Sequence, residues 1–177
     1  LVFNVTWGAA WSVLVLDVLD RLHMGQVGFG VLTAASAVGG MLAILLYPRL
    51  ERRFTLATLM KVCLTLEVVT HLGLALDTRA WVAVGILFVF GAYAFVWMTV
   101  STTVRQRAVP AALQGRVAGT YLIGVFGGMV LGQFLGGVIA QRFGIAAPFW
   151  FAFVGSGLTL AAMWRQLGAI AHAEPAV

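Results

Sequence analysis

Long apolar stretches alternate with short polar segments along the whole chain. A transmembrane helix needs about 20 apolar residues, whereas a membrane strand alternates in polarity over about 10 residues. The continuous apolar runs therefore predict an all-α integral membrane protein with six transmembrane helices. The predicted spans are residues 3–19, 25–47, 54–76, 80–103, 117–140 and 143–164.

The composition agrees with a membrane location. Of the 177 residues, 62% are hydrophobic and 10% are charged, whereas soluble domains carry about 25% charged residues. The chain contains no metalloprotease, phosphate-loop or nucleophile-elbow motif, and its one cysteine, Cys63, matches no metal-ligand spacing. We therefore expect neither an enzyme nor a bound metal or other cofactor.

Positive charge is concentrated at alternate ends of the spans. Eight of the eleven Lys and Arg residues lie on one side of the membrane if the first span begins in the cytoplasm. Cytoplasmic loops carry such an excess, so the net charge of +5 is a topology signal and we expect no nucleic-acid partner. Some of these residues can also pair with Glu51 when the inner face closes. The residues expected in the cytoplasmic loops and gate are Arg49, Arg52, Arg53, Arg107, Gly115 and Arg116.

The connections between the spans are short, so consecutive helices are expected to be antiparallel neighbours. The longest connection, residues 104–116, is expected to lie on the inner surface as a short amphipathic helix. All four prolines fall at or outside the span ends, and Pro148 indicates that the sixth helix starts nearer Ala147. We expect one six-helix membrane domain, 1–166, followed by a short cytoplasmic tail, 167–177. The apolar start of the chain indicates a piece of a longer protein.

Small residues form a stripe along the fifth span, because residues four apart share one helix face. Such stripes let helix backbones approach closely in lipid, so we expect helix packing, or a sliding contact that opens a pathway. The second span carries a shorter version in Ser36 and Gly40. Both Gly-rich spans are second in a group of three, which predicts two inverted three-helix repeats. The stripe comprises Gly124, Gly128, Gly132 and Gly136.

The longest connection also carries a motif. Residues 106–117 read QRAVPAALQGRV, which resembles the junction between the tenth and eleventh helices of major facilitator superfamily exporters, most closely the subgroup containing enterobactin and macrolide exporters. The turn at 137–144 is similar to that subgroup as well. The loop at 44–53 departs from the family's usual pattern, since Pro48 stands where an Asp is usual. The resemblance implies helices seven to twelve of twelve, an N-terminal six-helix half as partner and a bacterial inner-membrane location.

In that family layout, spans one, two, four and five face a central cavity, and spans three and six are peripheral. Aromatic and polar residues recur at helical spacing on the first and fourth spans, and two such faces meeting across a cavity suit a large, partly apolar ligand. The alternative is ordinary helix packing. The candidate substrate-binding residues are Asn4, Trp7 and Trp11, with Gly8 on the same face, and Tyr93, Trp97 and Ser101.

Ionisable residues inside a membrane are functional candidates by default. Glu67 lies near mid-bilayer in the third span, and His71 follows one turn later on the same face. Because low dielectric favours the protonated form of a carboxylate, the pair can exchange a proton during a transport cycle. The alternative is a structural hydrogen bond between helices. Asp17, near the outer end of the first span, is either an outer gate carboxylate or a solvated interface residue.

Together these features predict a secondary transporter that exports small amphiphilic molecules, coupled to protons, by alternating access. The expected partners are the small-molecule substrate, protons, the lipid bilayer and the N-terminal half. An importer of the same fold remains an alternative, because rocking is reversible. A non-transporting membrane scaffold or accessory subunit is a second alternative.

Overall fold

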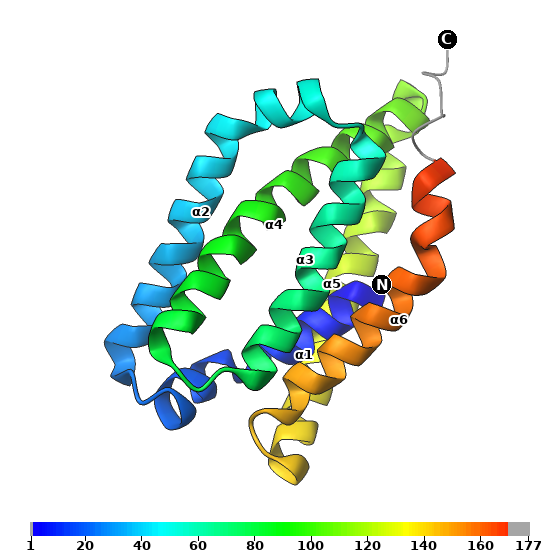
Figure 1. Cartoon of the computed structure of the whole chain (residues 1–177). Helices are drawn as coiled ribbons and strands as arrows, with labels where there is room; N and C mark the ends of the chain where they lie inside the picture. Colours follow the sequence, from blue (N-terminus) through cyan, green and yellow to red (C-terminus); the bar gives the residue numbers. More distant parts are fainter. Residues whose placement is uncertain (1, 170–177) are drawn as a thin grey trace.

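The computed structural model describes residues 2–169 and is helical nearly throughout this range. Six helices are long and apolar enough to cross a membrane (Figure 1), which confirms the predicted fold class. The last residues of the predicted tail, 170–177, lie outside the described residues. The helices are α1 (Val2–Leu16), which continues as a π-helix (Asp17–Arg21), α2 (Gly25–Arg53), α3 (Leu56–Leu76), α4 (Ala80–Ala108), α5 (Gln114–Phe143) and α6 (Ala147–Ala169).

The second helix is longer than predicted, because it continues through Pro48 to Arg53. Proline cannot donate its backbone hydrogen bond and clashes with the preceding turn, so it kinks a helix rather than always ending it. After this point α2 bends toward the start of α3 (Figure 1). The bent turns carry Arg52 and Arg53, whose side chains are exposed.

The expected amphipathic helix over residues 104–116 is wrong. Instead α4 continues to Ala108, and Val109 is extended, with φ −121° and ψ 125°. A residue before proline is pushed out of the helical region, so Pro110 sets the end of α4. A single 3-10 turn, Ala111–Leu113, then leads into α5. The chain thus reverses within a few residues, and both helices extend beyond their predicted spans.

The remaining helix starts follow local sequence signals. α3 starts after Thr55, whose Oγ1 accepts a hydrogen bond from the backbone N–H of Thr58 at 3.2 Å. α6 starts at Ala147 with Pro148 buried in its first turn, as predicted.

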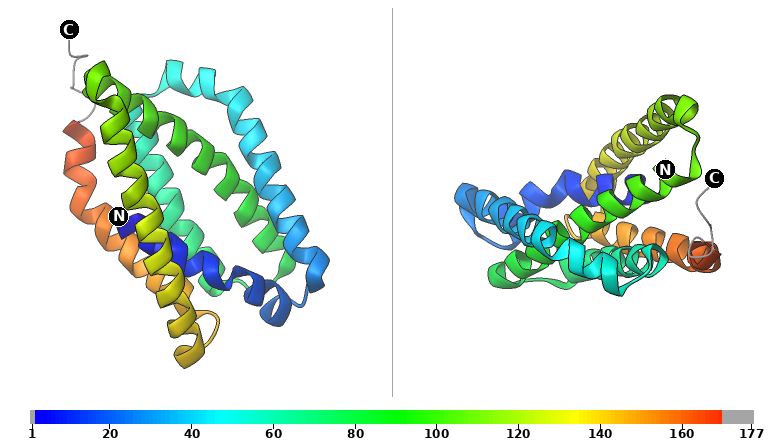
Figure 2. Two further views of the ribbon diagram at one scale, coloured as in Figure 1. Left: turned by 180° about the vertical axis from the view of Figure 1, so that it is seen from behind. Right: turned by 90° about the horizontal axis from the view of Figure 1, so that it is seen from above.

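The helices form two groups of three, α1–α3 and α4–α6, and most of the packing is between the groups. α1 packs along α5 and α2 along α4, while α3 and α6 pack against each other and against α4 and α1, respectively (Figures 1 and 2). The expectation that consecutive helices are neighbours is therefore wrong for α1 and α2, for α2 and α3 and for α4 and α5, because the long crossings place each of these helices against a helix of the other group. Exchanging the first three helices with the last three leaves this set of neighbours unchanged. The structure therefore has the inverted-repeat arrangement that the Gly-rich spans predicted.

Glycines allow close backbone contact in both long helix crossings, α1 with α5 and α2 with α4. In α1–α5, a Cβ on Gly132 would overlap the carbonyl oxygen of Val5. In α2–α4, a Cβ on Gly39 would overlap the carbonyl oxygen of Phe88 in the same way. Such backbone-to-backbone approach is possible only where one helix lacks side chains, so these positions fix how the paired helices cross.

The predicted glycine stripe of α5 is only partly used within this chain. Gly128, Gly132 and Gly136 are buried, and the last two contact α1. Gly124 has open space where a Cβ would stand.

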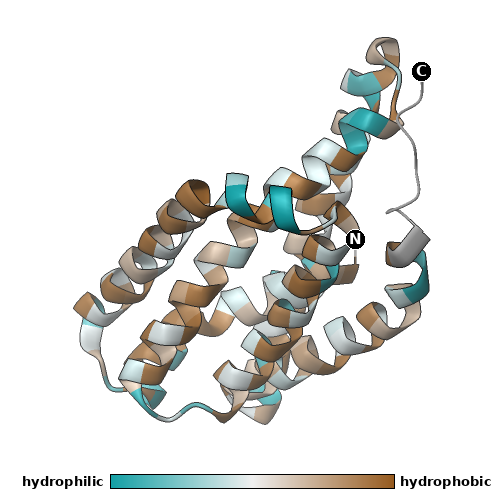
Figure 3. Ribbon diagram, turned by 45° about the horizontal axis from the view of Figure 1, so that its top comes forward, coloured by the Kyte–Doolittle hydropathy of each residue, from teal (hydrophilic) through white to brown (hydrophobic). Residues whose placement is uncertain are grey.

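Polar residues gather at the helix ends and apolar residues cover the middle (Figure 3). Exposed arginines mark the end of α2 and the junction of α4 and α5. Because successive helices alternate in direction, these places lie at the same end of the bundle. Orientation toward the cytoplasm stays a prediction.

Candidate functional site

An aromatic cluster joins α1 to α4. The rings of Trp7 and Trp11 stack with their centroids 5.2 Å apart, one helical turn from each other. Phe90 of α4 lies 5.4 Å from Trp11, and Tyr93 meets Phe90 edge-on at 5.5 Å. Aromatic pairs in these geometries attract by about 0.5–1.5 kcal/mol beyond area burial. The cluster therefore brings together aromatic residues from both predicted faces.

Tyr93 connects this cluster to the third helix. Its side chain is 5% exposed and lies between α4 and α3 rather than on an open face. The hydroxyl faces the Glu67 carboxylate and the Thr70 hydroxyl. A buried tyrosine hydroxyl needs a polar partner, and α3 places these two polar side chains beside it.

The predicted Glu67–His71 pair forms on α3. Glu67 Oε1 lies 3.8 Å from His71 Nε2, and His71 Nδ1 lies 3.4 Å from Ser156 Oγ on α6. The Ser156 hydroxyl donates to the Ala152 carbonyl oxygen at 2.6 Å, so its oxygen is left to accept Nδ1–H of His71. The other ring nitrogen then faces the carboxylate at 3.8 Å, which is longer than a hydrogen bond.

A small cavity lies between the aromatic cluster and the ionisable pair. It has a volume of about 10 Å³ and is lined by Trp7, Trp11 and Phe90 on one side and by Thr70 and His71 on the other. This volume is near the minimum for one water molecule. The aromatic cluster and the ionisable pair thus meet at a single place between α1, α3 and α4.

Comparison with known families identifies the fold. The profile of the transmembrane secretion effector family, a family of the major facilitator superfamily, matches residues 1–174. The chain belongs to this family. No curated protein and no solved structure matches it. The family supports a membrane transporter with a general role in efflux. It does not single out the subgroup of enterobactin and macrolide exporters.

The other predicted substrate-binding residues of this transporter make none of the ring contacts that define the aromatic cluster. Asn4 and Trp97 are half-buried, and the buried Ser101 hydroxyl donates back to the Met98 carbonyl oxygen at 3.3 Å. Gly8 does not share the face of the tryptophans, because it packs against the backbone of Met129 in α5. Trp7 and Trp11 turn toward α4 instead.

Asp17 is not a solvated interface residue, which corrects one of the two sequence-based interpretations. Its side chain is 1% exposed and accepts a hydrogen bond from Arg21 Nη1 at 2.7 Å. The guanidinium of Arg21 also donates to the last carbonyl oxygens of α3, at Leu74 (2.9 Å) and Asp77. A cation at a helix C-terminus donates hydrogen bonds to the free carbonyl oxygens and is attracted by the negative end of the helix dipole. The pair therefore ties the end of α1 to the end of α3.

The predicted cytoplasmic residues are exposed at the arginine-rich end of the transporter. Among the described residues, Glu51 forms no ion pair in this conformation, so the proposed pairing of the gate is not seen here. Arg105 instead places its guanidinium 3.8 Å from the ring centroid of Tyr121, joining α4 to α5. The exposed residues are Arg49, Arg52, Arg53, Arg107, Gly115 and Arg116.

Three contacts of the candidate site and its surroundings involve residues that the sequence patterns did not single out. Phe90 completes the aromatic cluster, and its place three residues before Tyr93 on α4 could have indicated it. Ser156 and Arg21 act across helices more than 50 positions away in the chain, and no local pattern signals such partners. No group of three His, Cys, Asp or Glu residues within 2–169 could hold a metal ion.

Proposed function

We propose that the chain is the C-terminal half of a proton-coupled exporter of small amphiphilic molecules in the bacterial inner membrane. It works with an N-terminal six-helix half, and the two halves rock around a site near the middle of the membrane. The resemblance of residues 106–117 to enterobactin and macrolide exporters favours this substrate class. The observation that carries the proposal is the junction between the aromatic cluster and the Glu67–His71 pair.

The aromatic cluster supplies the recognition chemistry. Trp7, Trp11 and Phe90 offer ring faces that suit an apolar or cationic ligand body. Asn4, Trp97 and Ser101 extend the predicted surface along α1 and α4. The ligand enters between the halves, so rocking exposes these rings to one side of the membrane and then to the other.

The ionisable pair supplies the coupling. With Ser156 accepting from Nδ1–H, His71 Nε2 faces Glu67 Oε1 at 3.8 Å, and a small approach of the two side chains lets them exchange one proton. Tyr93 meets Phe90 edge-on, and its hydroxyl faces the Glu67 carboxylate. Movement of the aromatic rings therefore changes the polar surroundings of the carboxylate. Ligand binding and proton binding thereby bias the same element, which is what coupled transport requires.

Transport by the intact protein in liposomes tests this proposal. A radiolabelled macrolide serves as the probe, and a pH gradient is imposed across the membrane. Glu67→Gln is expected to lose gradient-driven accumulation about tenfold, the size of a typical coupling effect, while ligand exchange without a gradient persists. The matched control is Asp20→Asn, which changes an exposed carboxylate at the end of α1, away from the middle of the bundle. Equal accumulation by both variants would rule out the coupling role.

The same assay separates the alternatives. An importer accumulates the ligand only when the imposed gradient is reversed. A scaffold or accessory subunit shows no gradient-driven accumulation, and replacement of Trp11 then changes assembly without changing flux. Both results would overturn export as the function.

A further inference from the structure

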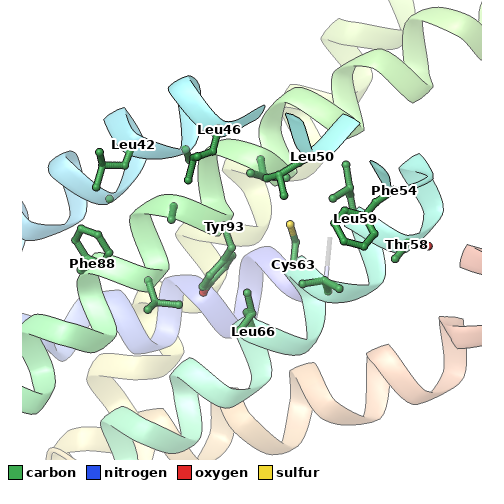
Figure 4. A pocket seen from close by; sticks show the side chains of 16 residues that line it. Leu42, Leu46, Leu50, Phe54, Thr58, Leu59, Cys63, Leu66, Phe88 and Tyr93 are labelled. Carbon is green, nitrogen blue, oxygen red and sulfur yellow. The ribbon is translucent and has the colours of Figure 1, made fainter. Parts of the chain in front are cut away.

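A second and larger cavity, of about 390 Å³, lies between α2, α3 and α4 (Figure 4). α2 and α3 form its walls, and α4, against which both helices pack, forms its floor. Its lining is almost entirely aliphatic and aromatic. Side chains that line it include Leu42, Leu46, Leu50, Val62, Leu66 and Phe88. It differs from the aromatic cluster, with which it shares Tyr93.

The cavity is a groove open to the side of the bundle. Leu46 on one wall and Val62 on the other are each 49% exposed. Along α2 the lining runs from Gly39 to Leu50, which is about 16 Å at the helical rise per residue. Half of the about 30 Å hydrocarbon core of a bilayer is nearly the same length. The groove is therefore about as long as one leaflet is thick.

The mouth of the groove is positively charged. Leu50 and Phe54 line the end of the groove that lies nearest the arginines, and they belong to the segment that bends after Pro48. The same segment carries three exposed arginines and one exposed acidic residue, which leaves a net positive charge beside the mouth. These residues are Arg49, Arg52, Arg53 and Glu51.

We propose that this groove binds an anionic phospholipid of the leaflet at the arginine-rich end, with one acyl chain between α2 and α3. The phosphate then lies against Arg52 and Arg53, since basic segments at the end of a membrane helix attract anionic headgroups. An acyl chain fits the apolar groove better than a polypeptide does, because the backbone groups of a polypeptide would find few hydrogen-bond partners there. The site is independent of the proposed transport function.

Photo-crosslinking of the intact protein in phosphatidylcholine liposomes tests the proposal. The probes are a phosphatidylglycerol and a phosphatidylcholine that carry the same photoactivatable group in one acyl chain. We expect the anionic probe to label peptides of α2 and α3 about tenfold more than the zwitterionic probe, because two arginines act on its phosphate. Equal labelling by the two probes, or labelling spread evenly over all six helices, would overturn the site.

Two pairs of variants localise the lipid. Val62→Trp fills the groove and is expected to abolish labelling of α2 and α3, whereas Leu158→Trp, on the exposed face of the peripheral helix α6, leaves it unchanged. Arg52→Gln with Arg53→Gln is expected to remove only the preference for the anionic probe, and Arg142→Gln at the opposite end serves as its control.

If Val62→Trp does not fold, Leu46→Trp blocks the groove from the facing wall. Unchanged labelling in a folded groove-filling variant would overturn the proposal. Loss of labelling on addition of the macrolide would also overturn it, because the groove would then be a substrate path.

Discussion

His71 in α3 and Ser156 in α6 lie 3.4 Å apart, between Nδ1 and Oγ, and both side chains are buried. These helices are the third members of the two inverted repeats, so the contact joins the two repeats directly. The serine hydroxyl has two tasks there, because it also donates to the Ala152 carbonyl oxygen. Removal of this hydroxyl leaves His71 Nδ1 without its partner on α6.

Ser156→Ala is therefore expected to destabilise the protein through His71. Hydrogen bonds between membrane helices contribute about 0.6 kcal/mol on average. A double-mutant cycle with His71→Ala should give a coupling energy of this size, measured by unfolding the intact protein in sodium dodecyl sulfate. Thr159→Ala is the control, since its hydroxyl donates to Gly155 of the same helix. Equal coupling of both hydroxyls to His71 would contradict the contact.

Gly132→Ala is expected to destabilise the α1–α5 crossing. The new Cβ overlaps the Val5 carbonyl oxygen, and overpacking of this kind costs about 1–3 kcal/mol. Gly124→Ala, two turns earlier on α5, meets open space and should stabilise the helix by about 0.5–1 kcal/mol. The same unfolding assay measures both variants.

The inverted repeat gives this prediction a second arm. Gly39→Ala meets the Phe88 carbonyl oxygen in the α2–α4 crossing as Gly132→Ala meets Val5. The two substitutions should lower the free energy of unfolding by similar amounts. If only one of them is destabilising, the two crossings are not energetically equivalent.

Arg21→Gln is expected to loosen the ends of α1 and α3 that lie away from the arginine-rich end of the bundle. The guanidinium holds both Asp17 and the terminal carbonyl oxygens of α3, and hydrogen bonds to charged groups contribute about 1.5–3 kcal/mol each. We expect a loss near the lower value, because Arg21 is 20% exposed. Unfolding measurements should show almost no effect of Arg79→Gln, whose side chain is exposed at the same end.

The Asp17 variant separates a gate from a structural tie. If Asp17 serves only to position Arg21, Asp17→Asn lowers stability and leaves macrolide flux per folded molecule unchanged. A change in flux with unchanged stability would instead favour the outer gate.

Trp11→Leu is expected to weaken ligand recognition. It removes the ring contacts with Trp7 and Phe90 and the surface offered to a ligand, at about 0.5–1.5 kcal/mol, which corresponds to a rise in the KM of macrolide export of about 2- to 13-fold. Trp81→Leu, which is 70% exposed at the start of α4, is the control. An unchanged KM with reduced assembly would favour the scaffold alternative.

The sequence by itself determined the six spans, their order and the inverted repeat. Span length and hydrophobicity are local properties, because lipid requires each crossing segment to satisfy its own backbone hydrogen bonds. The pairing of Glu67 with His71 was also predictable, since residues four apart share one helix face. Helix ends were less so, because Pro48 lies within α2 while Pro110 follows the end of α4.

Only the tertiary structure decided which faces meet. The glycine crossings set the rotation of α1 against α5 and of α2 against α4, and this rotation directs Gly8 to α5 and Trp11 to α4. The same packing buries Asp17 under Arg21, brings Ser156 to His71 and leaves the groove between α2 and α3 open. Contacts of this kind depend on the tilt and rotation of whole helices, which distant residues fix together and no single segment encodes.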